Sequence, residues 1–381
     1  MKGLPRKKRI CVSLNTTYNH QREIFHGIQR FARGQKDWRL LLISYDGKVT
    51  PEIERIESVD GVIGFLTGEG EDACHLEAAR AAAGNRVVSV SGQDSMMKVP
   101  RVLSEDLAVG RMAADYLTGL GYEHFAFFAE SVSPGYAAMD DRAQGFSERL
   151  LKSGRSCGFF QQQNIYKSDF HLKPNTAIFT FNLSVARLLI EELAERMIAV
   201  PEEVAVLGVD KDPFLQKISA VPISSIALNS EKIGYEAAGL LKRLLDGEEF
   251  EPGFVLRVPS LGVESRTSTE AFKHEDPIIR KTLGLLRREI ANITSVAQCA
   301  ALVGSSRSTL ERRFRDILGR TVREVIESTR IDYTKSLLRE TDLTITEIAA
   351  SAGFGDSRML SVVFRRVTGR TPSEFRRRMK E

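Results

Sequence analysis

The chain has 381 residues, 42 % of them hydrophobic, and a formal net charge of +4. This length allows two or three domains with hydrophobic cores of their own. Residues 277–381 carry 21 Lys and Arg against 12 Asp and Glu, whereas the rest of the chain has a net charge of −5. A basic C-terminal region behind a mildly acidic one favours nucleic acid as a partner at one end only, although a solvated helical surface would give the same balance.

Several classes of protein are disfavoured by short-range patterns. The four cysteines are scattered, with no C-x-x-C pair and no nearby His at metal-ligand spacing, so we expect reduced thiols and no metal. The basic N-terminus leads into one short apolar run rather than the apolar core of a signal peptide. No stretch approaches the roughly eighteen apolar residues of a membrane span. We therefore expect a cytoplasmic protein without a membrane partner.

Residues 8–270 alternate short apolar runs with segments of helical period. This alternation is typical of parallel sheets covered by helices on both faces. Two α/β lobes of about 130 residues each fit the length better than one sheet does. The predicted strands are 10–14, 40–44, 61–65, 86–91, 124–129, 176–179 and 204–209, and the predicted helices include 22–33, 72–83, 108–120, 143–152 and 184–196.

Residues 271–381 contain a sequence repeat with an offset of fifty positions. Nine residues recur, among them Phe314 as Phe364 and the run Gly319-Arg320-Thr321 as Gly369-Arg370-Thr371. Each copy has a capping residue, a small-residue helix, a glycine turn and a basic second helix. This order predicts two helix-turn-helix units, at about 294–317 and 344–367, in an all-α domain.

Local signals set the limits of these helices. We expect Thr294 and Ser306 to cap the two helices of the first unit, and Asp356 to cap the second helix of the second. The pattern Thr344-Ile-Thr-Glu347 predicts a capping box. A helix over 322–338 then joins the units. Its length of about 26 Å would allow the two basic helices to lie one turn of B-DNA apart, about 34 Å.

Each basic helix should bury one face. Three apolar positions recur at helical spacing in each copy and predict the core side. They are Leu310, Phe314 and Ile317 in the first copy and Leu360, Phe364 and Val367 in the second.

Longer sequence phrases resemble two known families. LSEDLAVGRMAADYLTGLGYEHFAFF, DDRAQGFSERL, VPEEVAVLGVDKDPF and ISSIALNSEKIGYEAAGLLKRLLDG are similar to the sugar-binding domain of LacI-type repressors and periplasmic binding proteins. The C-terminal repeat resembles the DNA-binding domain of AraC-type activators. Together they imply a two-lobed α/β periplasmic-binding-protein-like domain, residues 8–270, followed by an all-α tandem helix-turn-helix domain, residues 271–381.

The resemblance implies a ligand site at the strand ends. Arg142 would donate to two sugar oxygens, and Asp210 would accept from two hydroxyls; the alternatives are a surface arginine and an N-cap. Asp106 matches an aspartate near the crossover between lobes, for which a cap or hinge role is equally plausible. Asn15, Asn182 and Arg22 complete the candidate set, with Phe181, Phe214 or Tyr136 as the ring that stacks on the sugar.

The resemblance also implies which side chains face DNA. Arg312 and Arg358 would each bind a guanine, and Glu311 would accept from a cytosine amine. Arg315 and Arg365 recur in both copies, so contact with phosphate or a neighbouring carboxylate fits them better. Ser308, Ser357 and Ser361 complete the candidate DNA-facing set.

The expected function is a transcription factor controlled by a small sugar, with a pentose as first candidate effector and double-stranded DNA as partner. We expect a homodimer that contacts RNA polymerase if it is an activator. A sugar-binding protein of transport and a regulator of a non-pentose ligand are the alternatives. We expect no cofactor and no enzyme activity, because no positioned nucleophile, glycine-rich phosphate loop or metal cluster is evident.

Overall fold

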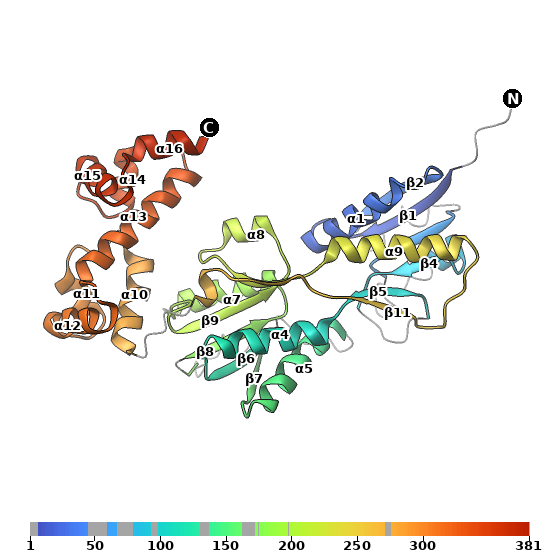
Figure 1. Cartoon of the computed structure of the whole chain (residues 1–381), viewed down its shortest axis with the longest axis horizontal. Coiled ribbons are helices and arrows are strands. Elements are labelled where there is room, and N and C mark those ends of the chain that lie inside the picture. Colours follow the sequence, from blue (N-terminus) through green and yellow to red (C-terminus); the bar gives the residue numbers. More distant parts are fainter. Residues whose placement is uncertain are drawn as a thin grey trace. The chain divides into compact units, whose positions relative to one another are not determined.

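The computed structural model describes residues 7–44, 59–66, 79–92, 98–129, 137–161, 172–173, 175–196, 198–270 and 276–380. The chain divides into two compact units (Figure 1). One unit comprises residues 1–195 and 205–270, and contains two α/β lobes. The other comprises residues 271–381 together with residues 196–204, and its regular structure is helical.

The first lobe is built on a parallel sheet with strand order β11-β5-β4-β3-β1-β2. Strand β1 is the second strand from one edge of this sheet, and it pairs with the edge strand β2 on one side and with β3 on the other. Its residues from Ile10 to Leu14 are buried, as expected for a strand covered on both faces. The strands are β1 (Lys8–Leu14), β2 (Trp38–Ser44), β3 (Gly61–Gly64), β4 (Val87–Ser89), β5 (Arg101–Ser104) and β11 (Val255–Val258).

The second lobe has a sheet of strand order β12-β10-β9-β8-β6-β7. Its strands are parallel except for β12, which pairs antiparallel with β10 at one edge. The chain therefore enters the second sheet at β6 and returns to the first at β11. The strands are β6 (His124–Ala129), β7 (Cys157–Gln161), β8 (Thr176–Thr180), β9 (Val204–Val209), β10 (Ser224–Ala227) and β12 (Gly262–Glu264).

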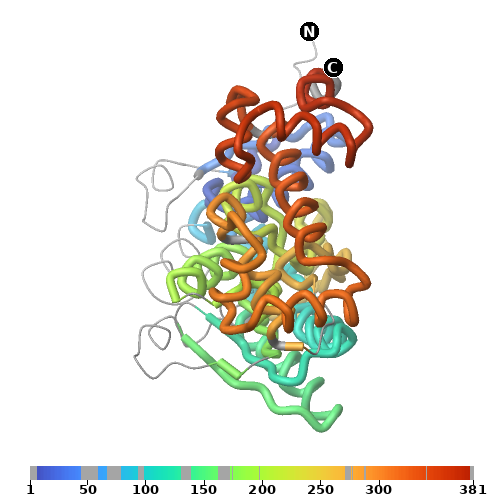
Figure 2. Tube along the Cα trace, turned by 90° about the vertical axis from the view of Figure 1, so that its left-hand side faces the viewer, coloured from blue at the N-terminus to red at the C-terminus, as the bar shows by residue number. Residues whose placement is uncertain are grey.

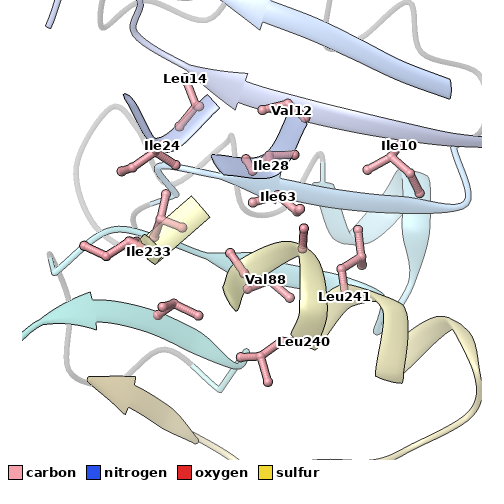
Figure 3. Packing of buried hydrophobic residues seen from close by; sticks show 14 of the residues in the cluster. Ile10, Val12, Leu14, Ile24, Ile28, Ile63, Val88, Ile233, Leu240 and Leu241 are labelled. Atoms are coloured by element: carbon pink, nitrogen blue, oxygen red, sulfur yellow. The ribbon is translucent and has the colours of Figure 1, made fainter. Parts of the chain in front are cut away.

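Each lobe has a pair of helices in close contact. In the first, α1 (Asn19–Ala32) and α9 (Ser230–Leu245) lie together and contribute Ile24, Ile28 and Ile233 to its core (Figure 3). In the second, α4 (Asp106–Gly119) packs on α5 (Ala137–Lys152). A Cβ at Gly110 would lie 2.2 Å from the Arg142 carbonyl oxygen, and one at Gly145 would lie 2.2 Å from that of Leu107. Glycine at both positions therefore allows α5 to bring Arg142 close to the start of α4.

The helical unit has two hydrophobic cores that share one helix. The first half of α13 (Val322–Glu340) packs in a core with α10, α11 and α12, through Val322, Val325 and Ile326. Its second half contributes Ile331 and Leu338 to a core with α14 and α15. Figure 2 shows α13 running from the orange helices to the red ones. The other helices are α10 (Pro277–Glu289), α11 (Val296–Leu302), α12 (Arg307–Leu318), α14 (Ile345–Ser351), α15 (Ser357–Thr368) and α16 (Pro372–Lys380).

The predicted fold class is confirmed, and all seven predicted strands are present, with ends within two residues of the predicted ones. Strands β5, β7, β10, β11 and β12 were missed, and three of them, β7, β11 and β12, lie at sheet edges. In β10 the buried residues Ser224 and Ser225 are polar, which hides the apolar pattern of a strand. The first part of the predicted helix 72–83 lies outside the described residues, and residues 79–83 are helical.

Candidate ligand site and nucleic-acid interface

Arg142 is the centre of a polar cluster at the strand ends of the second lobe. Its side chain is 7 % exposed, and its Nε donates to Asp106 Oδ1 at 2.7 Å. Its Nη1 donates to the Phe181 carbonyl oxygen at 2.7 Å, and the guanidinium lies 5.0 Å from the centroid of the Phe181 ring. Ser104 Oγ donates to the second Asp106 oxygen at 2.8 Å. The guanidinium is thus fixed by Asp106 and Phe181, and it has further N–H donors beyond those used in these two bonds.

Asp210 follows β9 and has a backbone φ of 85°, a conformation that only a few per cent of residues other than glycine adopt. Its side chain is 14 % exposed, and its Oδ1 has no hydrogen-bond partner in the described part of the chain. Burial raises the pKa of Asp210 from 3.8 to about 7, although the Lys211 amide and the Arg142 charge act in the opposite direction. Backbone strain together with a carboxyl whose pKa is shifted by burial is typical of a functional site.

His20 brings the first lobe to this cluster. Its Nδ1 lies 3.8 Å from Asp210 Oδ2, and its ring centroid lies 5.9 Å from that of Tyr18 and 6.2 Å from that of Phe65. Although 31 % of the side chain is exposed, burial among protein groups lowers the pKa of His20 from 6.5 to about 4, with Arg142 and Arg22 contributing. His20 is therefore neutral at pH 7 and does not form an ion pair with Asp210.

The other predicted ligand residues use their side chains to hold loops. Asn15 Oδ1 accepts from the Thr17 amide at 2.9 Å, and Asn182 Oδ1 accepts from the Val185 amide at 2.8 Å at the start of α7 (Leu183–Glu195). Arg22 donates to the carbonyl oxygens of Thr16 and Thr17 at 2.7 and 2.8 Å. These residues shape the loops after β1 and β8, and Arg22 also adds positive charge beside His20.

The structure therefore brings Arg142, Asp106, Phe181 and Asp210 together and adds His20, which the sequence analysis missed. The only sequence signal for His20 was its place in the segment between Asn15 and Arg22. Of the other two predicted stacking rings, Phe214 is exposed on α8 (Pro213–Ile218), and Tyr136 lies outside the described residues. In the described part of the chain, no three His, Cys, Asp or Glu side chains are grouped so that they could bind a metal ion.

The caps of the helical unit follow the predicted signals, with one exception. Both bonds of the capping box are present at Thr344 and Glu347, and Ser306 and Asp356 cap α12 and α15. Gly319 and Gly369 end these helices in the left-handed conformation. The exception is Thr294, because Ser295 is the N-cap of α11 and accepts from the Gln298 amide at 3.1 Å. Thr294 instead donates its hydroxyl to Gln298 Oε1.

The recognition helices, α12 and α15, bury Leu310 with Phe314 and Leu360 with Phe364, as predicted. The prediction was wrong for Ile317 and Val367, which are 44 % and 50 % exposed. Val363 is buried in α15 instead. Of the predicted DNA-facing residues, Ser308, Arg312, Arg315, Arg358 and Arg365 are exposed, and Glu311, Ser357 and Ser361 are partly exposed.

Each recognition helix therefore presents a basic face to solvent on the side opposite its core. Glu311 pairs with Arg307 at 3.1 Å, and Ser361 Oγ donates to the Ser357 carbonyl oxygen at 2.8 Å. None of the described helices is both long and apolar enough to cross a bilayer. Two α/β lobes with polar side chains at their strand ends, joined to two helix-turn-helix units, define the class of DNA-binding regulators with a ligand-binding-type domain.

Comparisons with known proteins agree with this class. Residues 114–269 match the model of a periplasmic binding protein-like domain, and residues 299–378 match a helix-turn-helix domain. The xylose operon regulatory protein of Haemophilus influenzae is 26 % identical over 383 residues, which cover 97 % of this chain and 98 % of that protein. The Escherichia coli K12 protein of the same name is 26 % identical over 390 residues, 97 % of each chain.

A solved structure of a xylose-binding transcription activator has a TM-score of 0.77 to this chain and is 25 % identical to it. The similarity covers 98 % of this chain and 99 % of that one. The chain thus carries a periplasmic binding protein-like domain followed by a helix-turn-helix domain, and over nearly its whole length it is similar to proteins named as xylose operon regulators.

Proposed function

We propose that this regulator responds to a pentose, with D-xylose as first candidate, and binds tandem sites on duplex DNA. The observation that supports this most is the cluster of Arg142, Asp210 and His20 at the strand ends of the two lobes. It occurs in a chain similar along its length to proteins named as xylose operon regulators. Those names are the reason for placing xylose first.

The chemistry of the cluster suits a polyhydroxylated ring. Arg142 supplies N–H donors in a fixed orientation, and neutral His20 offers one donor and one acceptor. The unpaired Oδ1 of Asp210 accepts from a hydroxyl when the group is ionised and donates or accepts when it is protonated. A sugar would satisfy these groups, and a buried polar group left without a partner costs roughly 1–3 kcal/mol.

The aromatic side chains beside the cluster supply apolar surface. Phe181 lies against the Arg142 guanidinium, and Phe65 and Tyr18 flank His20. The C–H face of a pyranose would rest on one of these rings while its hydroxyls meet the polar groups. Phe181 is the best placed, because its ring lies 5.0 Å from the Arg142 guanidinium that would bind the hydroxyls.

The mechanism that we infer is a shift of population. Sugar bound at groups from both lobes stabilises a closed arrangement of the lobes, which changes a homodimer interface on the α/β domain. The dimer then holds its helix-turn-helix units on tandem half-sites, where it activates transcription by contact with RNA polymerase. This role places the protein in the cytoplasm.

Calorimetric titration with xylose, arabinose, ribose, fucose and glucose tests the ligand, and gel shifts on the upstream region of the protein's own operon test the response. We expect xylose to bind and to strengthen the gel shift. The variant Asp210→Asn should lose both effects, whereas Phe214→Ala, which alters an exposed ring on α8, should keep them. If no sugar of this panel binds while DNA still does, the protein is a regulator of a non-pentose ligand.

A further inference from the structure

The second recognition helix carries an apolar residue at the centre of its solvent-facing side. Val362 is 65 % exposed in α15, while Leu360, Val363 and Phe364 of the same helix are buried. At about 100° per residue, Val362 points away from this core, with Arg358 one turn before it and Arg365 one turn after it. A valine therefore lies between the two arginines that we assign to DNA.

The first recognition helix differs at this position. In the fifty-residue repeat, Val362 corresponds to Arg312 and Arg358 corresponds to Ser308, whereas Arg315 and Arg365 are the same. Arg312 is exposed, as Val362 is. Both helices thus have an arginine at the position that we assign to phosphate. They have different side chains at the positions that we assign to bases, so we expect them to prefer different sequences.

An apolar side chain has one specific target in the major groove. The 5-methyl group of thymine is the apolar feature of the base edges, and small apolar side chains contact it. Valine suits such a contact because its branched Cβ restricts χ1, which keeps its methyl groups in place. The flanking arginines would hold the helix in the groove of an anionic duplex.

We propose that Val362 contacts the 5-methyl group of a thymine, beside the base pair contacted by Arg358. The inference rests on the proposed binding of DNA and adds the base chemistry of one half-site. The second half-site then requires a thymine at a position where the first, facing Arg312, favours a guanine. Because the two half-sites would differ in sequence, the tandem helix-turn-helix domain would bind them in one orientation only.

The test uses full-length protein and its strongest site from a selection with random duplexes. Each thymine in turn is replaced by deoxyuridine, which lacks only the 5-methyl group. Loss of one buried methyl contact should weaken binding by the wild type about fourfold at one position in the second half-site. The variant Val362→Ala, which keeps only the Cβ, should show a smaller difference between thymine and deoxyuridine at that position and keep the wild-type response at every other.

Two variants control for folding and for exposed apolar surface. Val367→Ala alters a valine that is 50 % exposed in the same helix but lies on the side of the core, and it should keep the wild-type deoxyuridine profile. Val362→Thr keeps one methyl group and the branched Cβ, and it should keep part of the thymine preference. Thermal unfolding of all variants should coincide within a few degrees.

The outcomes separate this inference from the function on which it rests. A wild type that shows no preference for any duplex in the selection would overturn the proposed function and this inference together. A wild type that selects a site but tolerates deoxyuridine at every position would overturn the inference alone. The same holds if Val362→Ala keeps the wild-type profile, because the methyl contact would then belong to another residue.

Discussion

The α/β domain and the helical domain use charged side chains in opposite ways. Arg142 and Asp106 are almost fully buried and are joined by a 2.7 Å hydrogen bond, and Asp210, 14 % exposed, has no hydrogen-bond partner for its Oδ1 among the described residues. Arg312, Arg358 and Arg365 are exposed on the recognition helices. A buried charge is costly unless it is paired, whereas an exposed one is solvated and contributes little to stability.

Because of this difference, stability and recognition depend on the same side chains in the α/β domain and on different side chains in the helical domain. In the α/β domain, changes at the proposed ligand residues should alter the free energy of unfolding, because Arg142 and Asp106 also pair with each other in the interior. In the helical domain, changes at the proposed DNA-facing residues should alter affinity for DNA and leave the free energy of unfolding unchanged. Target preference can therefore change more easily than ligand preference.

The largest expected effect is on the buried pair. Arg142→Ala removes the charged partner of the buried Asp106 carboxylate and leaves it the hydrogen bond from Ser104, and we expect a loss of about 3–5 kcal/mol in unfolding free energy, with loss of sugar binding. Urea denaturation of Arg142→Ala, Asp106→Ala and the double variant measures the coupling. The double variant should lose less than the sum of the single losses. Additive losses would show that the two side chains stabilise the protein independently.

At Asp210 we expect a substitution to raise the unfolding free energy. Burial raises the pKa of this carboxyl to about 7. The unfolded carboxyl ionises near 3.8 and the folded one near 7, so rising pH destabilises the folded protein through this range. Asp210→Asn removes that cost and should stabilise the unliganded protein by roughly 1–3 kcal/mol at pH 8.

The gain from Asp210→Asn should shrink as pH falls from 7 and vanish below about 4, where the wild-type carboxyl is protonated in both states. Asparagine also tolerates the positive φ of this position. Denaturation of variant and wild type at pH 8, 6 and 4 gives the comparison. If the gain in unfolding free energy stays constant over this pH range, its cause is the backbone conformation and not the ionisation of Asp210.

In the helical domain the effect should appear in binding alone. Arg358→Ala should cost about 1–3 kcal/mol on the selected site and relax preference at one base pair. Arg365→Ala should weaken all sequences alike and reduce the slope of affinity against salt by about one. Gel shifts on selected and scrambled duplexes at several salt concentrations separate the two. Equal loss on both duplexes for Arg358→Ala would place that residue on phosphate.

The smallest effect is expected at Glu311, which pairs with Arg307 on the surface of α12. Glu311→Gln should change the unfolding free energy by less than about 0.5 kcal/mol, because an exposed pair one turn apart contributes little. Its effect should appear as relaxed preference at one cytosine. A stability loss above about 1 kcal/mol would contradict the division between the two domains.

What the sequence could predict follows the same division. The helical domain depends on neighbours in the chain, so Thr344 with Glu347 and Gly319 with Gly369 set its helix ends correctly. Periodicity places Ile317 and Val367 on the core side of their helices but could not show that both are exposed. In the α/β domain, resemblance located Arg142 and Asp210, but the pairing of Arg142 with Asp106 and the approach of His20 depend on contacts between distant segments. Such contacts cannot be predicted from the pattern of neighbouring residues.

The helix α13 has a consequence for how target sites can evolve. Because its two halves belong to the two cores of the helical domain, it fixes the rotational phase between the recognition helices. One residue inserted at its middle would rotate the second helix by about 100° relative to the first, and the two could no longer face the same side of a duplex. About seven residues, close to two turns, would restore this phase but would add about 10 Å to the distance between the helices, which would then no longer match one turn of B-DNA, about 34 Å. The length of α13 therefore sets the spacing of the operator half-sites, and insertions in this helix cannot change that spacing in small steps.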